Sequence, residues 1–191
     1  MQVVAQREDG VSVVRIDSDA DGEAWRAAFV GAYQAIWSEP PYNERFSPDE
    51  AAAVFRRALE TNDNVTLIAV RPSGVVVGFG IAFPVIAKAD VVRDIRGLLP
   101  IDHTFYFAEL GVMDPWRKKG LGRQLIDLRL QLLDRKRFTH VVLRTSAVRN
   151  ATYEMYKDFG FEDTGVYMEV PSRRVDGTSR TDRRLFMAKV V

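Results

Sequence analysis

Apolar and polar positions in the first half of the chain alternate in blocks typical of short strands and amphipathic helices. The run Val11–Ile16 predicts a strand, and apolar residues from Trp25 to Trp37 recur at the spacing of one helix face, with Asp21 as the expected cap. Ser47 to Glu50 forms a capping box with proline at the first helical position, which predicts a second helix. A hairpin is predicted next, with strands at Val65–Arg71 and Val75–Phe83.

The second half of the chain alternates strands with helices. Strands are expected at Thr104–Met113, His140–Thr145, Asp163–Val170 and Arg183–Val191, and helices at Ala89–Leu99, Gly120–Lys136 and Asn150–Phe159. This order predicts a mixed α/β or α+β architecture. No repeat or linker interrupts the pattern, so we expect residues 1–191 to form a single domain.

Composition narrows the function classes. The chain has 27 basic and 26 acidic residues, which argues against binding nucleic acid through a general basic surface. It contains no cysteine, which excludes disulfides, cysteine-ligated metals and a cysteine nucleophile, and its two histidines suggest no metal site. With no signal-like N-terminus and no apolar run near the ~20 residues that span a bilayer, we expect a cytoplasmic protein without a membrane partner.

One basic, glycine-containing segment between a predicted strand and a helix suggests anion binding. It consists of Arg117, Lys118, Lys119, Gly120, Leu121 and Gly122. Glycine lets backbone approach a phosphate, and the first N–H groups of a helix are free to bind it. From Pro115 to Arg137 there are eight basic and two acidic residues. The alternative is a glycine turn that opens a solvated helix.

The spacing of this segment and a later motif resembles that of a known enzyme family. Arg-x-x-Gly-x-Gly, a leucine-rich helix and a strand precede Asn150 and then the run from Tyr156 to Phe161, with Gly160 before the final phenylalanine. This order resembles the GCN5-related N-acetyltransferase (GNAT) superfamily. The resemblance implies a GNAT-like fold with helices around a mostly antiparallel sheet of about seven strands. It also implies acetyl-CoA as co-substrate and no metal.

The resemblance assigns the cofactor site residue by residue. It implies that acetyl-CoA binds at Leu110, Gly111, Val112, Arg117, Lys118, Lys119, Gly120, Leu121, Gly122, Asn150 and Tyr156. In the family, two parallel strands splay apart and the pantetheine arm pairs with one of them; here they would be Thr104–Met113 and His140–Thr145. The Val112 N–H would face the thioester carbonyl, and Tyr156 would act as general acid toward the leaving thiolate. The alternative for Tyr156 is an aromatic residue of the helix face.

A general base is also needed, because a primary amine is almost fully protonated at neutral pH. Glu109 is the first candidate, since it is the lone charge in an apolar strand and burial would raise its pKa. Strand alternation predicts that Glu109 shares a face with Phe105 and Phe107, opposite Tyr106 and Leu110. The alternative is an ion pair at the sheet edge. His103 and Glu44 are weaker candidates.

In this family the acceptor site is walled by two loops, which correspond here to Trp37–Arg45 and Pro171–Arg184. The first loop offers Trp37, Glu39, Tyr42 and Glu44, which could hold an ammonium group by charge and cation–π contact. The second carries five arginines and two aspartates, which either attract an acidic substrate or are simply solvated. The segment Pro84–His103 is longer than the family's usual connection and is open to interpretation as a lid, an oligomer contact or neither.

Three function classes follow. The first is an N-acetyltransferase that acts in a ternary complex on a primary amine, of a small molecule by preference or of a protein N-terminus or lysine as the alternative. The second is a non-catalytic coenzyme A-binding module. The third is a nucleic-acid binder that uses Pro115–Arg137, whereas our prediction is that nucleic acid is not a partner. A homodimer is left open.

Overall fold

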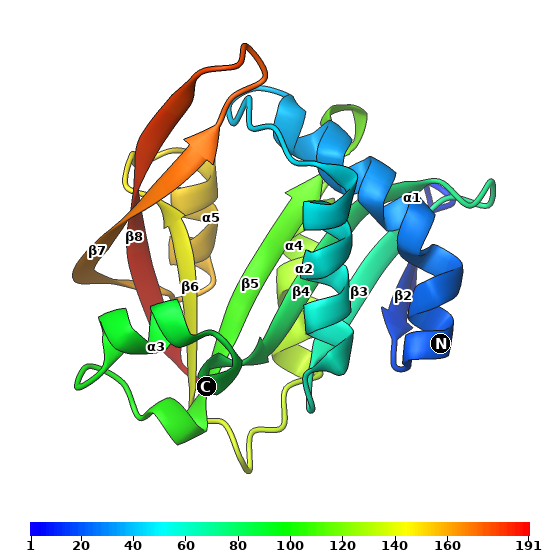
Figure 1. Cartoon of the computed structure of the whole chain (residues 1–191). Helices are drawn as coiled ribbons and strands as arrows, with labels where there is room; N and C mark the ends of the chain where they lie inside the picture. Colours follow the sequence, from blue (N-terminus) through cyan, green and yellow to red (C-terminus); the bar gives the residue numbers. More distant parts are fainter.

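The computed structural model describes residues 1–191, except for the side chain of Asp19. Eight strands form one sheet in the order β1-β2-β3-β4-β5-β6-β8-β7 (Figure 1). The strands are β1 (Gln2–Gln6), β2 (Ser12–Ile16), β3 (Val65–Val70), β4 (Val76–Pro84), β5 (Thr104–Val112), β6 (His140–Ser146), β7 (Glu162–Arg173) and β8 (Ser179–Val190). Only β5 and β6 pair in parallel, which confirms the predicted mixed and mostly antiparallel fold.

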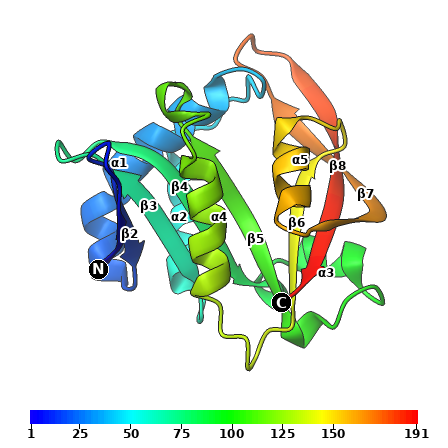
Figure 2. The ribbon, with the colours of Figure 1, turned by 180° about the vertical axis from the view of Figure 1, so that it is seen from behind.

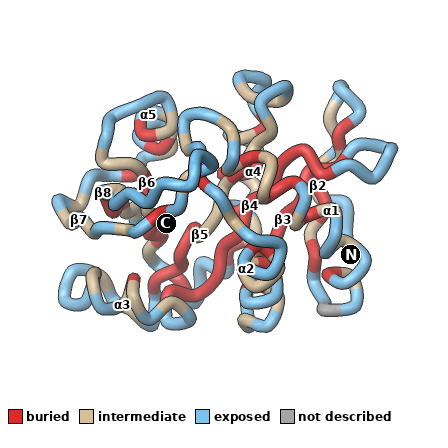
Figure 3. Tube along the Cα trace, turned by 45° about the horizontal axis from the view of Figure 1, so that its top comes forward, coloured by how far each residue is buried: buried red, intermediate tan, exposed pale blue. Residues whose placement is uncertain are grey.

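Helices cover both faces of the sheet. The helices are α1 (Asp19–Ser38), α2 (Pro48–Glu60), α3 (Ala89–Ile95), α4 (Leu121–Gln131) and α5 (Ala151–Asp158). One buried cluster joins the sheet to α1 and α2, and the other joins it to α4 and α5 on the opposite face (Figures 1 and 2). The most buried backbone follows the central strands, whereas the outer loops are largely exposed (Figure 3). In α3, Val91 and Ile95 are buried. None of the helices described is long and apolar enough to cross a membrane.

Helix caps agree with the sequence at two positions and differ at one. The capping box of Ser47 and the cap by Asn150 are both present, and each cap side chain accepts backbone N–H donors of its helix. The expected cap of α1 was wrong, because Ser18 is the N-cap and accepts from the Asp21 N–H. The Asp21 carboxylate instead binds the N-terminal ammonium group, 2.5 Å away.

The sequence patterns did not predict two stretches of strand whose side chains are mostly polar or exposed. β1 raises the strand count to eight from the expected seven, and its side chains are half-buried or exposed, so no apolar pattern marks it. The segment Pro171–Arg184 was predicted to be a loop, but it is mostly a hairpin in which Pro171 pairs with Thr181 and Arg173 with Ser179. Backbone pairing in such an exposed hairpin does not require apolar side chains.

β5 and β6 separate toward the end of the sheet where the functional site lies. Their parallel pairing joins Thr104–Phe107 with His140–Leu143 and does not continue beyond these residues (Figure 2). Residues 108–112 of β5 therefore have β4 as their only strand neighbour. The splay expected between these two strands is present.

A β-bulge in β5 changes which way its side chains point. Glu109 pairs with Ile81, and Phe107 pairs with the next residue of β4, so Ala108 is an extra residue. Arg129 of α4 supports this bulge from within the core, where its Nη1 donates to the carbonyls of Glu109 and Ile81 at 3.1 and 3.3 Å. The bulge breaks the two-residue alternation just before Glu109.

Gly111 is required by packing in β5. A Cβ atom at Gly111 would lie 2.5 Å from Cζ of Phe79, whereas a Cβ at Gly31, on the exposed face of α1, would meet no atom within 4 Å. We expect Gly111→Ala to destabilise the protein by about 1–3 kcal/mol. Gly31→Ala should stabilise it by about 0.5–1 kcal/mol, because alanine is the better helix former. Thermal unfolding of both variants tests this contrast, and equal melting temperatures would contradict it.

Candidate active site

A cavity of about 650 Å³ lies where β5 leaves β6, and we call it the splay cavity. It is lined by Leu110, Gly111 and Val112 of β5, by Lys118, Gly120, Gly122 and Arg123 of the basic loop and α4, by Asn150, Ala151, Thr152 and Met155, and by Ile36, Pro41 and Tyr42. The structure thus brings together most of the residues that the sequence assigned to cofactor binding, from three separate segments.

The start of α4 gives the splay cavity its electrostatic character. Gly120 has φ +81° and occupies the N-cap position, where no side chain caps the first N–H groups of the helix. These groups have no partner within the helix, and the helix dipole makes this end positive. Lys118 adds charge at the wall, whereas Arg123, which also lines it, forms an ion pair with Asp158. This end of the cavity can therefore bind an anion through backbone donors.

Arg117 lines the splay cavity but its guanidinium is engaged inside the protein. Nε donates to the carbonyl of Val112 at 2.9 Å, and Nη1 donates to the carbonyl of Pro40 at 3.0 Å. Nη2 forms an ion pair with Glu39 at 2.9 Å. Arg117 thus connects the end of β5 to the loop after α1.

The other predicted cofactor residues differ in their placement. The side-chain oxygen Oδ1 of Asn150 accepts from the backbone N–H groups of Thr152 and Tyr153. This leaves the side-chain nitrogen Nδ2 as a donor at the cavity wall. Leu121 is buried in the core, and the Lys119 ammonium lies 5.2 Å from the centre of the Trp116 ring. Neither of these two side chains lines the splay cavity.

Tyr156 is buried below the splay and lines neither of the two large cavities. Its ring packs edge-on against Phe161, with 5.7 Å between the ring centres. Burial raises the pKa of Tyr156 to about 12, and the neighbouring Arg129 guanidinium opposes this rise. The phenol is therefore protonated at neutral pH, as a proton donor must be.

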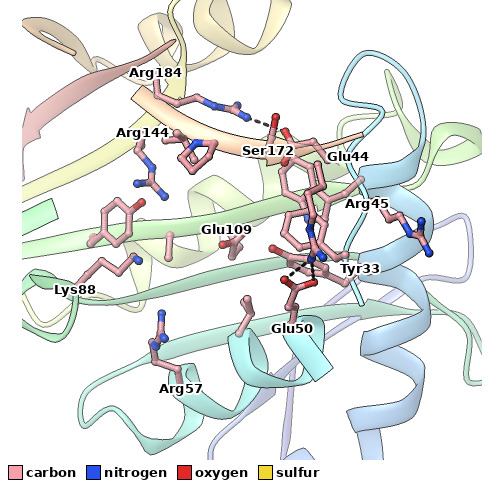
Figure 4. A pocket seen from close by; sticks show the side chains of 18 of the residues that line it. Tyr33, Glu44, Arg45, Glu50, Arg57, Lys88, Glu109, Arg144, Ser172 and Arg184 are labelled. Carbon is pink, nitrogen blue, oxygen red and sulfur yellow. Dashed lines mark hydrogen bonds and ion pairs between the residues drawn. The ribbon is translucent and has the colours of Figure 1, made fainter. Parts of the chain in front are cut away.

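A second cavity of about 510 Å³, the Glu109 cavity, lies on the α1–α2 face of the sheet (Figure 4). Its aromatic wall comprises Tyr33, Trp37, Phe46, Phe83 and Tyr106, and its charged residues are Glu44, Arg45, Glu50, Arg57, Lys88, Glu109, Arg144, Arg173 and Arg184. Ala108 and Glu109 of β5 line this cavity, whereas the next three residues line the splay cavity. Adjacent residues of β5, Glu109 and Leu110, therefore line the two different cavities.

The predicted face of Glu109 was wrong. It lies with Tyr106 and Ala108 in the Glu109 cavity, whereas Phe105 and Phe107 belong to the core of the opposite face. The bulge at Ala108 is the physical reason, because one extra residue reverses the side-chain alternation. Burial raises the pKa of Glu109 to about 7, although the nearby Arg144 and Lys88 oppose the rise. Such a carboxyl can exchange a proton near neutral pH.

The two expected wall loops are hydrogen-bonded to each other. The Arg45 N–H donates to the Arg173 carbonyl at 2.7 Å, and the Val175 N–H donates to the Asn43 carbonyl at 3.0 Å. Glu44 forms an antiparallel bridge with Arg174 between these two bonds. The loop after α1 and the β7–β8 hairpin therefore form one continuous wall on this side of the Glu109 cavity.

The four predicted acceptor residues do not form one ammonium site. Trp37 and Glu44 line the Glu109 cavity, whereas Tyr42 lines the splay cavity. Glu39 is paired with Arg117, as described above, and Glu44 is paired with Arg184 at 2.8 Å. Both carboxylates are thus already neutralised by arginines. His103, the other weak base candidate, lines neither cavity and its Nδ1 contacts the Arg137 carbonyl at 2.9 Å.

Sequence analysis missed several residues of the Glu109 cavity, above all Arg144 and Lys88. Arg144 directly follows three apolar residues of β6 and is the only arginine, lysine, aspartate or glutamate of that strand, so a signal similar to the one that identified Glu109 was present there as well. Lys88 lies in the long segment Pro84–His103, just before α3, and nothing in its local pattern marks it.

Comparisons with known proteins agree with this fold. The model of the acetyltransferase (GNAT) family matches residues 23–161. No curated protein matches the chain.

Solved structures show the same fold at low identity. An acetyltransferase-like structure from Acinetobacter baylyi is 15% identical, with 95% of this chain and 92% of that chain covered and a TM-score of 0.68. Ribosomal-protein-alanine N-acetyltransferase from Brucella melitensis is 20% identical, with 94% and 99% covered and a TM-score of 0.62. NAA60 from Arabidopsis thaliana, in complex with acetyl-CoA, is 18% identical, with 95% and 98% covered and a TM-score of 0.64. Because the family model spans most of the chain, the protein belongs to the acetyltransferase (GNAT) family.

Proposed function

We propose that this acetyltransferase moves the acetyl group of acetyl-CoA to a primary amine, of a small molecule, by direct attack in a ternary complex. The observation that carries the proposal is that adjacent residues of β5 line two cavities of different character. One cavity has the donors for a phosphate-bearing cofactor, and the other holds the Glu109 carboxyl. An amine beside Glu109 and a thioester beside Leu110 would be neighbours.

The residues of the splay cavity fit acetyl-CoA by their donor chemistry. The uncapped N–H groups of α4 suit the pyrophosphate, with Lys118 as a countercharge. The Met113 N–H bonds to Val77 on β4, so alternation turns the N–H groups of Val112 and Leu110 away from β4 and toward the splay. These groups suit a pantetheine arm that pairs like a strand. When bound, acetyl-CoA supplies the activated acetyl thioester.

Each proposed catalytic residue has one task. Glu109 accepts the proton that the ammonium group must lose before the nitrogen can attack. The Val112 N–H stabilises the oxyanion of the tetrahedral intermediate. Tyr156, from its position below the splay, gives a proton to the leaving thiolate, and its phenol is protonated at neutral pH because burial raises its pKa to about 12. Direct attack agrees with the absence of cysteine, which excludes a cysteine acyl-enzyme.

The continuous wall favours a small acceptor over an extended polypeptide. A polypeptide that crossed the Glu109 cavity would have to pass between the loop after α1 and the β7–β8 hairpin. These segments are joined there by hydrogen bonds of Arg45 and Val175. Acetylation of a protein N-terminus or lysine is the second candidate, in which only the terminal residues would enter from the open side.

Calorimetric titration with acetyl-CoA, followed by thiol-release assays with a panel of amines, tests the proposal. We expect binding at one site per chain and amine-dependent thiol release. Absence of acetyl-CoA binding would overturn the proposal. Binding without turnover of any amine, peptide or small molecule, would instead support a coenzyme A-binding module. Calorimetric titration with duplex DNA should give a flat isotherm, which would exclude the nucleic-acid binder.

A further inference from the structure

The Glu109 cavity carries more positive than negative charge. Six basic side chains and three carboxylates line it. Glu44 is paired with Arg184, and Glu50 is paired with Arg173 and also accepts from the Ser47 N–H. The excess charge therefore resides on Lys88, Arg144, Arg57 and Arg45. Figure 4 shows Arg45 pointing away from Glu109, whereas the other three surround the space beside it.

Arg144 is poorly neutralised by the protein itself. Its side chain is 20% exposed, and its nearest carboxylate is Asp90, at 3.5 Å. The same nitrogen, Nη1, lies 3.1 Å from the sulfur of Met168. No hydrogen bond from its Nε or Nη2 is found among the described residues. A guanidinium with free donors on one side is suited to bind a carboxylate or phosphate in bidentate fashion.

The side chain of Lys88, the residue just before α3, points into the same space as that of Arg144 (Figure 4). Its ammonium lies 2.9 Å from Asp90, the carboxylate that Arg144 also approaches, so one acid is shared by two cations. Arg144 and Lys88 also oppose the rise of the Glu109 pKa that burial causes. Arg57 lines the cavity from α2, and no ion pair of its side chain is found among the described residues. The local charge would repel a purely cationic amine.

We propose that the acceptor is an amine that also carries a carboxylate or phosphate group, which Arg144 and Lys88 bind while the amine faces Glu109. The inference rests on the proposed function and names the substrate class of the same site. It replaces the expectation of an acidic and aromatic ammonium site, because Glu39 and Glu44 are already paired with arginines. The aromatic wall of the cavity suits an apolar side group on the acceptor.

The first test compares matched acceptors with the wild-type enzyme, so that it does not depend on any variant. Amino acids are assayed against their amides, and phosphoethanolamine is assayed against ethanolamine. We expect the anionic member of at least one pair to have a kcat/KM roughly 10- to 100-fold higher than its neutral partner. The pair that shows the preference identifies carboxylate or phosphate as the anion. Equal use of both members in every pair, or preference for the uncharged members, would overturn the inference.

The second test uses Arg144→Gln with Arg93→Gln as the matched control. Arg93 is a 73% exposed arginine of α3 that lines neither cavity. Arg144→Gln should raise KM for the anionic acceptor by roughly 10- to 100-fold and leave the neutral partner and acetyl-CoA affinity within about twofold. The control should change neither. An equal loss for both acceptors in a folded Arg144→Gln protein would contradict the inference, and Lys88→Gln replaces Arg144→Gln if the latter does not fold.

A binding measurement separates failure of this inference from failure of the proposed function. N-acetyl amino acids and their amides are titrated calorimetrically into the wild-type protein and the variants. If no amine releases thiol, the proposed function fails, but selective binding of the anionic member, lost in Arg144→Gln, still supports the anion site. If amines are acetylated without regard to anionic groups and neither product analogue is preferred, the function holds and this inference fails.

Discussion

Replacing Glu109 by glutamine is expected to lower kcat/KM for acetyl transfer by about 10²- to 10⁴-fold, the usual contribution of a positioned general base. Glutamine keeps the size of the side chain but cannot accept the proton of the ammonium group. Acetyl-CoA affinity should stay within about twofold, because Glu109 lines the other cavity. Glu60→Gln, an exposed change on α2, is the matched control and should be neutral.

The pH dependence gives this variant a second, sharper readout. Because the pKa of Glu109 is about 7 and the base must be ionised, kcat/KM of the wild type should rise with pH and level off above about pH 7. At pH 6 it should be about tenfold below the plateau. The residual activity of Glu109→Gln should lack this limb. If Glu109→Gln shows the same rise of kcat/KM with pH, a group other than Glu109 causes that rise.

The raised pKa of Glu109 also predicts that Glu109→Gln stabilises the folded protein, although the same change lowers activity. In the folded state burial raises the pKa of Glu109 to about 7, above its ordinary value of 4.5. Folding is therefore progressively penalised as pH rises from 4.5 to 7, and the full penalty, at most about 3 kcal/mol, applies above pH 7. Glu109→Gln should thus unfold at a higher temperature than the wild type at pH 8 and at a similar temperature at pH 4.

The second large effect is expected for Gly120→Glu, which should weaken acetyl-CoA binding by about 100-fold or more, roughly 3 kcal/mol. The change places a carboxylate at the helix end that is proposed to hold the pyrophosphate. It also forces a non-glycine residue to adopt φ +81° at the N-cap of α4. Both effects act against an anionic ligand at the first N–H groups.

Gly97→Glu is the matched control, because it adds the same carboxylate and a similar backbone strain away from the splay cavity. Gly97 has φ +84°, and a Cβ atom there would meet nothing within 4 Å, as at Gly120. It lies after α3 and lines neither cavity, so this variant should pay a similar conformational penalty but keep acetyl-CoA affinity. Calorimetric titration of both variants decides the matter. Normal affinity in Gly120→Glu would mean that the loop does not hold the phosphates.

Much of the fold could be read from apolar periodicity and local caps. The strands of the core are marked by runs such as Val65–Val70, where every residue is buried, and α2 is marked by its capping box. The exposed β1 and the outer half of the hairpin carry no such signal, because backbone pairing alone makes them strands. Burial patterns therefore predict the centre of this sheet better than its edges.

The site was predictable where it depends on backbone and not where it depends on tertiary contacts. The basic glycine loop and the cap at Asn150 are local features, and both border the splay cavity. The face of Glu109 depends on a bulge that Arg129 stabilises from another helix, so strand alternation alone gave the wrong answer. Arg117 had been assigned to phosphate binding by charge, but Glu39 and two backbone carbonyls engage its side chain.

The hydrogen-bonded wall between Arg45 and Arg173 also bears on how products would leave. With that side of the Glu109 cavity closed, the acetylated amine would depart by the opening through which the free amine arrived. Spent coenzyme A would depart through the splay cavity on the other side of β5. The proposed mechanism then gives two independent routes of inhibition: the acetylated product should compete with the amine, and coenzyme A should compete with acetyl-CoA.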